Sequence, residues 1–99
     1  MEKSTGPLEF TASFPRDARY APTAGDLAAT LAQASGCAES ASLELREAVK
    51  AAFEAVLAEP DAGAPSEVGL ALHADGAALG TELTSGSRSY LRLQHPRLA

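Results

Sequence analysis

The side chains best suited to hold a metal ion or to attack a substrate are those of Cys37, His73 and His95. They lie far apart in the sequence, and their spacing matches no recognised zinc-ligand pattern. There is no G-x-S-x-G motif, and neither histidine stands in a recognisable motif with an acid and a nucleophile. We therefore predict no metal site and no catalytic residues. We expect Cys37 to be a small buried hydrophobe, His73 a half-exposed strand residue and His95 a solvated residue of the tail.

Acidic pairs and phosphate-binding loops are the next candidates for chemistry. Glu44 and Glu47 form an acid pair, but such pairs on an amphipathic helix usually belong to its solvated face. Neither glycine-rich phosphate motif, G-x-x-x-x-G-K-[ST] or G-x-G-x-x-G, occurs. The nearest approach is "TSGSRS" at residues 84–89, which we interpret as a turn that ends a strand.

The composition restricts the class of protein and the kinds of partner. The chain has 99 residues, enough for one domain, and 45% of them are hydrophobic, as in globular proteins. With 8 basic residues against 13 acidic ones, the net charge of −5 argues against nucleic-acid binding. No apolar run approaches the roughly 18 residues that span a bilayer, and the N-terminus lacks a signal-peptide core. A single cysteine fits a reducing compartment, so we expect a cytoplasmic protein without membrane contact.

Two helices are predicted in the first half of the chain. The earlier one covers residues 24–35; Thr23 and Asp26 form a variant capping box at its start, and Gly36 closes it. Its predicted apolar stripe consists of Leu27, Leu31 and Ala34. The later helix begins around residues 39–42, and its stripe is the best candidate for the centre of the core. That stripe consists of Leu45, Ala48, Val49, Ala52, Phe53 and Val56.

Alternation with a period of two predicts strands over residues 7–15, 67–73 and 77–85. Asp-Gly within residues 74–76 predicts a hairpin between the last two, and "RSYLRL" at 88–93 is a fourth strand or an irregular tail. This order predicts an α+β two-layer sandwich, with an antiparallel or mixed sheet of three or four strands and two helices on one face. The other face would be polar or half covered, and an oligomer could use it. It carries Glu9, Thr11, Ser13, Ala71, His73 and Glu82. We expect one domain over residues 7–94, with tails at 1–6 and 95–99.

Three stretches together resemble a known family. They are "LEFTASFPRDARYAPTAGDLAATLAQASGC", "AVKAAFEAVLAE" and "SEVGLALHADGAALGTELTSGS". In order and apolar pattern they are similar to bacterial anti-sigma factor kinases of the serine-protein-kinase type, within the histidine-kinase-like ATPase group that has the Bergerat fold. The resemblance covers about residues 8 to 88 and is to a truncated form, because the family's glycine-rich lid would follow Ala99.

The resemblance implies a nucleotide site that has lost its functional side chains. The family's helix motif needs a glutamate base and, four residues later, an asparagine for magnesium; Ala51 and Ala55 stand at these positions. The next motif needs an aspartate for adenine and spaced glycines; Thr84, Gly86 and Arg88 stand there. Alanine offers no donor, acceptor or charge, so we expect no cofactor. Alanine is also the best helix former, so the helix itself requires no ancestry.

The resemblance therefore predicts a non-catalytic regulatory domain that docks to proteins, such as a sigma factor or an antagonist, and that forms a homodimer. Candidate contacts are the loop at residues 17–23 with Arg16 and Tyr20, and the helix edge at Ala51 and Ala55. Two alternatives stay open. The chain could be an ATP-binding serine-protein kinase or ATPase with displaced catalytic groups, or a purely structural subunit of an oligomer.

Overall fold

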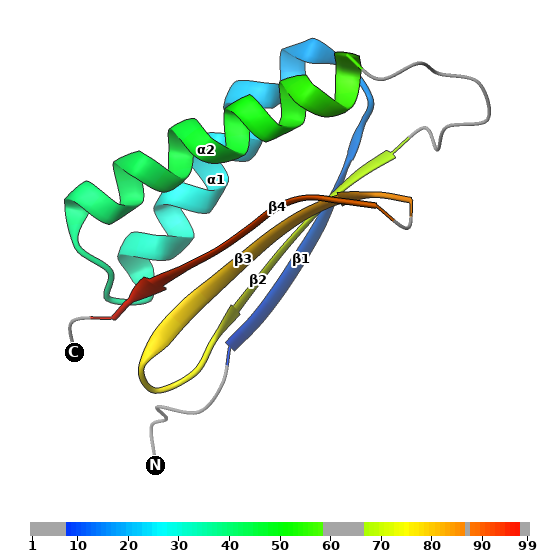
Figure 1. The fold of residues 1–99 in the computed structure, drawn as a ribbon. Helices are drawn as coiled ribbons and strands as arrows, with labels where there is room; N and C mark the ends of the chain where they lie inside the picture. Colours follow the sequence, from blue (N-terminus) through cyan, green and yellow to red (C-terminus); the bar gives the residue numbers. More distant parts are fainter. Residues whose placement is uncertain (1–7, 59–66, 87, 98–99) are drawn as a thin grey trace.

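The structure of the chain, a computed structural model, describes residues 8–58, 67–86 and 88–97. It confirms the predicted α+β fold of two layers: a sheet of four strands carries two α-helices on one face (Figure 1). In chain order the elements are β1 (Leu8–Pro15), a short 3₁₀ helix (Ala18–Tyr20), α1 (Ala21–Ala34), α2 (Glu39–Ala58), β2 (Glu67–Ala74), β3 (Ala78–Ser85) and β4 (Arg88–Pro96). The predicted tail at 1–6, residues 98 and 99, and most of the loop predicted after α2 lie outside the described residues.

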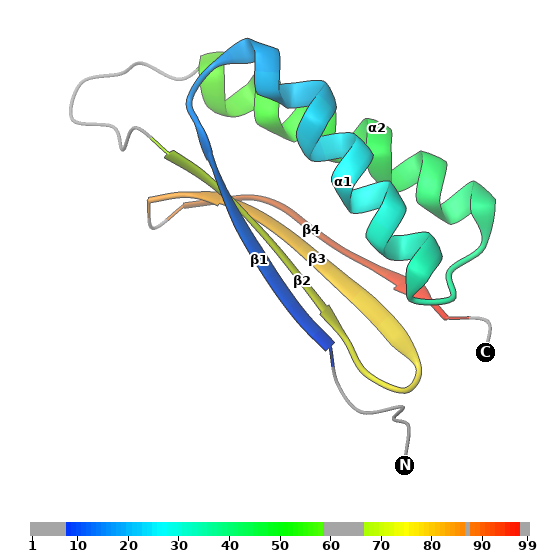
Figure 2. The same cartoon turned by 180° about the vertical axis from the view of Figure 1, so that it is seen from behind.

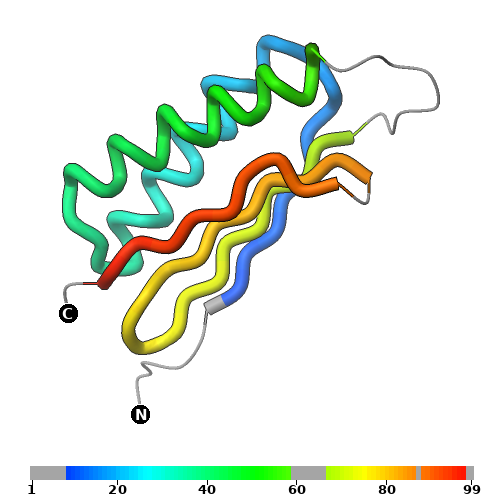
Figure 3. The backbone as a smooth tube through the Cα atoms, viewed as in Figure 1, coloured from blue at the N-terminus to red at the C-terminus, as the bar shows by residue number. Residues whose placement is uncertain are grey.

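The sheet is antiparallel throughout, with the strand order β1-β2-β3-β4. Of the two predicted alternatives for residues 88–93, the strand is therefore the one formed. α2 packs on β3 and β4, which lie in front in Figure 1. From behind, β1 is the front strand and α1 the nearer helix (Figure 2). The backbone trace shows how β1, from the start of the chain, joins the meander formed by the last three strands (Figure 3).

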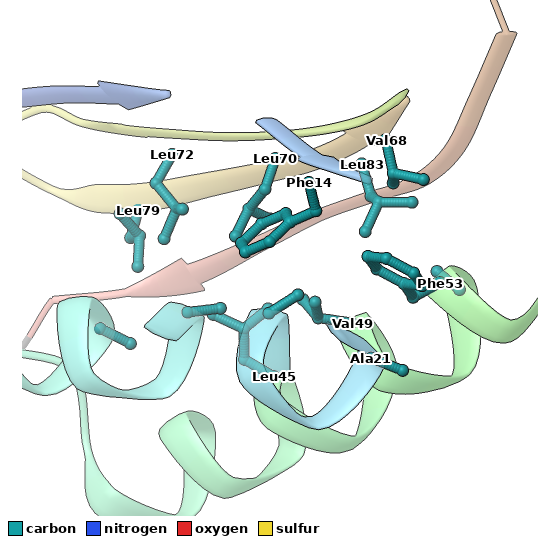
Figure 4. Packing of buried hydrophobic residues seen from close by; sticks show 14 of the residues in the cluster. Phe14, Ala21, Leu45, Val49, Phe53, Val68, Leu70, Leu72, Leu79 and Leu83 are labelled. Carbon is teal, nitrogen blue, oxygen red and sulfur yellow. The ribbon is translucent and has the colours of Figure 1, made fainter. Parts of the chain in front are cut away.

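The core lies between the sheet and the helices and follows the predicted alternation. The large apolar core side chains of β2 and β3 are those of Val68, Leu70, Leu72, Leu79 and Leu83. They point toward Val49 and Phe53 of α2 (Figure 4). The Phe53 ring is fully buried and meets the edge of Phe14, with the ring centroids 6.1 Å apart. The helix stripe predicted from the sequence is confirmed at Leu45, Val49, Ala52, Phe53 and Val56, which are all buried. The predicted centre of the core is therefore the observed one.

The prediction for the first helix is wrong in its start and in its face. α1 begins at Ala21, with Pro22 in its first turn, and Thr23 lies inside the helix as an exposed residue. The predicted capping box therefore does not form, because proline favours a start further upstream. The predicted stripe is displaced as well: Leu27 and Leu31 are half-buried and Ala34 is exposed. The buried residues of α1 are Ala21, Ala24, Gly25, Ala28 and Ala32.

The close crossing of the two helices explains why α1 buries its small residues. A Cβ atom built on Gly25 would lie 2.7 Å from the carbonyl oxygen of Arg46 on α2. The helices could not approach to this distance with a leucine at the contact. The leucines of α1 are therefore displaced to the flank of the contact, and the alanine and glycine face meets α2.

The ends of the elements follow the expected turn chemistry. Gly36 follows the end of α1 with a positive φ of 92°, the left-handed conformation predicted for the residue that ends this helix. Asp75 forms the β2–β3 hairpin by accepting the N–H groups of Ala77 and Ala78 on its carboxylate. These two hydrogen bonds lower the pKa of the Asp75 carboxyl.

Of the residues considered for chemistry, Cys37 agrees with its prediction and His95 does not. Cys37 is buried, as predicted, and forms an isolated bridge with Arg97 at the end of the sheet. His95 was expected to be solvated, but it is buried on β4 opposite Leu79. The error arises because the alternation of "YLRLQHP" continues past Leu93, which places His95 on the same face as Leu91 and Leu93.

Candidate functional site

Ala51 and Ala55 stand where the resemblance would require a glutamate and an asparagine. Both lie on the side of α2 that faces β4. Glu44, Ala48, Ala51 and Ala55 follow one another at helical spacings of four, three and four residues, so they share one face of α2. The carboxylate Oε1 of Glu44 lies 3.5 Å from Nε2 of His95 on β4, which fixes the side on which this stripe lies. Ala51 and Ala55 are exposed and Ala48 is half-buried. We call Ala48, Ala51 and Ala55 the alanine edge.

The other predicted site residues lie around the β3–β4 turn. Thr84 is half-buried, and its Oγ1 lies 3.2 Å from the position of a Cβ built on Gly69, so its side chain points to the sheet face opposite the helices. Gly86 makes the turn with a φ of 64°. The exposed Arg88 guanidinium lies 5.3 Å from the ring centroid of Tyr90. The sheet therefore separates Thr84 from Ala51 and Ala55, and these three residues do not face a common site.

The predicted contact loop at residues 17–23 is a structured corner. Arg16 is half-buried and donates from Nη2 to the carbonyl oxygen of Val56, 2.8 Å away, which ties the end of β1 to α2. Asp17 accepts the backbone N–H and the guanidinium of Arg19, and these bonds lower its pKa. Tyr20 packs its ring 6.4 Å from that of Phe14. These side chains stabilise the turn from β1 into α1.

The face of the sheet opposite the helices, which we call the open face, carries the polar residues predicted for it. Two side-chain contacts link residues that are directly opposite each other on neighbouring strands; the pair with Arg92 is an ion pair, and the pair with His73 is one when the imidazole is protonated. Glu9 lies 3.2 Å from His73, and Glu82 lies 3.1 Å from Arg92. All four side chains keep a third or more of their surface exposed. Exposed pairs of this kind contribute about 0–1 kcal/mol each to stability, so their charged groups remain able to meet a partner.

A shallow hollow of about 180 Å³ lies on the open face between β2 and β4. Its lining residues are Ala71, His73, Gly80, Thr81, Glu82, Arg92, Leu93 and Gln94. Gly80 forms the hollow because it has no side chain in the middle of β3. A Cβ built there meets only the carbonyl oxygen of His73, at 3.6 Å, which is an ordinary contact. Gly80 is not among the predicted site residues, although a glycine inside a strand is a signal for close approach of another group.

The buried groups with polar or reactive atoms include a thiol, an imidazole and a hydroxyl. Burial raises the pKa of the Cys37 thiol, which favours the less reactive protonated form. The Nδ1 atom of His95 and the Oγ1 atom of Thr81 are buried without a hydrogen-bond partner among the described residues. Within residues 8–58, 67–86 and 88–97, no group of three or more His, Cys, Asp or Glu side chains is placed to hold a metal ion.

In the part of the chain that the structure describes, neither helix combines the length and the apolar character needed to cross a bilayer. No family model, curated protein or solved structure matches the chain.

Proposed function

We propose that this chain is a non-catalytic regulatory domain that binds another protein through the open face of its sheet. The observation that carries the proposal is the hollow above Gly80, with His73, Glu82 and Arg92 on its rim. Small-molecule pockets typically measure about 300–1,000 Å³, so a hollow of about 180 Å³ better suits one side chain of a partner. Charged and polar groups around a small recess are the usual rim of a protein interface.

The alanine edge supports binding over catalysis. The methyl groups of Ala51 and Ala55 offer no base and no metal ligand at the positions that the resemblance assigns to them. The resemblance suggests a sigma factor or an antagonist as the partner. It also fits the cytoplasm, where the single buried thiol of Cys37 would stay reduced.

The experiment fills the hollow and leaves the fold intact. Gly80→Gln would place a side chain in the hollow, and the ordinary contact of a Cβ at this position indicates that β3 tolerates it. Gly76→Gln is the matched control, because a Cβ at Gly76 in the β2–β3 turn has no neighbour within 4 Å. Both variants and the natural chain would serve as bait in a lysate of the organism that encodes it. We expect one protein to be captured by the natural chain and by Gly76→Gln but not by Gly80→Gln. Equal capture by all three baits, or no specific capture, contradicts the proposal.

The ATP-binding alternative has its own measurement. Calorimetry with magnesium and ATP at roughly millimolar concentration, where even a weak site of millimolar Kd is half filled, should give no saturable heat. A saturable signal that persists in Gly80→Gln but disappears in Ala51→Lys would favour a nucleotide site beside α2 and overturn the proposal.

A further inference from the structure

The outer edge of β4 offers backbone groups, whereas the open face of the sheet offers side chains. β4 is the last strand of the sheet, and apart from the bridge between Cys37 and Arg97 no described residue pairs with its outer side. Such an edge presents unpaired backbone N–H and C=O groups to any strand that can align with them. Two backbone hydrogen bonds determine which groups of β4 point outward.

Two bonds at the end of the meander fix the direction of the backbone groups. The Arg97 N–H donates to the Ala77 carbonyl oxygen, 2.9 Å away, so Ala77 and Arg97 form a hydrogen-bonded pair. The next pair along the two strands, Ala78 and Pro96, is therefore a non-hydrogen-bonded pair. The Asp75 N–H donates to the Ala78 carbonyl oxygen, 3.0 Å away, so the backbone groups of Ala78 point toward β2 and away from β4. This agrees with the non-hydrogen-bonded pairing of Ala78 and Pro96. Because hydrogen-bonded and non-bonded pairs alternate, the N–H and C=O groups of Arg92 and Gln94 point away from β3.

The usable edge has two natural limits. At one end the register shifts beside Leu83 and Thr84, which leaves Tyr90 as the extra residue of a β-bulge. At the other end Pro96 has no N–H, and the Cys37–Arg97 bridge occupies the next position. The regular free edge therefore runs from Leu91 to His95, and its centre is Leu93.

We infer that two copies of this chain pair along this edge as antiparallel strands, with the two-fold axis at Leu93. In this register Arg92 lies opposite Gln94 of the second copy, and both exchange their outward N–H and C=O groups. The register centred on Arg92 would instead place two arginines side by side, which like-charge repulsion disfavours. The pairing of Leu93 with Leu93 also covers two half-buried leucines on the helix side of the sheet. Charge and apolar pattern thus select the same register.

The alanine edge gives the helices room in this dimer. α2 packs on β3 and β4, and neighbouring strands are about 4.8 Å apart, so the two α2 axes would lie roughly 10 Å from each other. α2 and β4 run in opposite directions (Figure 1), so from the Glu44–His95 contact Ala48 and Ala51 follow along α2 beside the part of β4 that precedes His95. Methyl groups there allow two helices to meet at this distance. The inference goes beyond the proposed function, because the edge and the open face are different surfaces.

The decisive variant removes one outward N–H. Gln94→Pro deletes a donor that β3 does not use, and proline is tolerated on edge strands, as Pro96 already shows. Gln94→Ala keeps the N–H and is its control. Sedimentation equilibrium up to roughly 100 µM, a range that detects micromolar dimers, should give a dimer for the natural chain and Gln94→Ala. Gln94→Pro should weaken the dimer at least about tenfold, because symmetry removes the bond twice. Circular dichroism checks that each variant is folded.

A second pair of variants tests the contact between the two α2 helices. Ala51→Lys should weaken the dimer, whereas Ala34→Lys at the exposed end of α1 should not.

Cysteine variants test the register of the paired strands. In a Cys37→Ala background under mild oxidation, Leu93→Cys should form a disulfide between two copies and Arg92→Cys should not. A natural chain that is monomeric at 100 µM, a Gln94→Pro dimer of unchanged affinity, or a crosslink through Arg92→Cys would each overturn the inference. Gly80→Gln, which tests the open face, should leave the dimer intact, so the two proposals can fail separately.

Discussion

The helix-covered face and the open face of the sheet are made by the same strands and differ in almost every other respect. Along β3, Leu79, Thr81 and Leu83 are buried beneath the helices, whereas Gly80 and Glu82 alternate with them toward solvent. The covered face excludes water from large apolar side chains, each worth about 1.5–3 kcal/mol when fully buried. The open face is held by exposed ion pairs of small net value. Its residues can therefore suit a partner at little cost to the fold.

The largest effect should come from the centre of the covered face. Phe53→Ala removes a fully buried ring that contacts Phe14, and we expect the free energy of unfolding to fall by about 3–5 kcal/mol in urea titrations. Leu43→Ala, on the exposed side of the same helix with 48% of its surface accessible, should change it by less than about 0.5 kcal/mol. Equal losses in the two variants would contradict the assignment of the core.

Glycines on the two sides of the molecule should respond in opposite ways to an added methyl group. Gly25→Ala would force a Cβ to within 2.7 Å of the Arg46 carbonyl, and we expect a loss of about 1–3 kcal/mol. Gly80→Ala meets only an ordinary contact on the open face and should be neutral or stabilising by up to about 1 kcal/mol, because it restricts the unfolded chain. Thermal unfolding of both variants measures the difference, and a destabilised Gly80→Ala would show that the hollow is tighter than described.

The side-chain pairs of the open face should contribute less to the free energy of unfolding than the contacts of Phe53 or Gly25. Arg92→Gln breaks the pair with Glu82 and should cost no more than about 1 kcal/mol, with a smaller cost at high salt. Urea titrations at low and high salt concentration give both numbers. A loss of several kcal/mol would mean that this face contributes to the fold as the covered face does.

The hairpin between β2 and β3 should add a dependence on pH. The N–H groups of Ala77 and Ala78 lower the pKa of Asp75 from its ordinary value of 3.8 in the folded state. The folded chain therefore binds fewer protons there than the unfolded chain, so this contribution is complete above pH 3.8 and is lost as the pH falls through the lower, folded pKa. Asp75→Asn should flatten the acid limb of a stability–pH curve. An unchanged limb would assign the dependence to other carboxylates.

The covered face could be predicted from the sequence because alternation and helical spacing determine it locally. Leu70 and Leu83 alternate with polar residues, and Val49 and Phe53 repeat at helical spacing. The face of α1 could not be predicted in this way. Leu27 and Leu31 are the more apolar residues, but the backbone contact at Gly25 decides which face meets α2, and that contact depends on a residue from another helix.

The candidate sites depend still more on contacts between distant residues. The hollow needs His73, Gly80 and Arg92 from three strands, and only the register of the sheet brings them together. His95 is buried because β4 continues beyond the residues whose alternation is obvious. The edge at Arg92 and Gln94 depends on the phase of the ladder bonds, which side-chain patterns do not record.

The pairing of β1 with β2 has a consequence for the order of folding. Pro15 lies opposite Glu67, so this ladder closes only after the chain has traversed both helices. The helical hairpin and the meander of the last three strands join neighbouring segments and lose little chain entropy, whereas β1 must close a long loop. We therefore expect β1 to join the sheet last and this step to limit the folding rate. The rate should lie in the slower part of the range for small domains that contain both helices and strands.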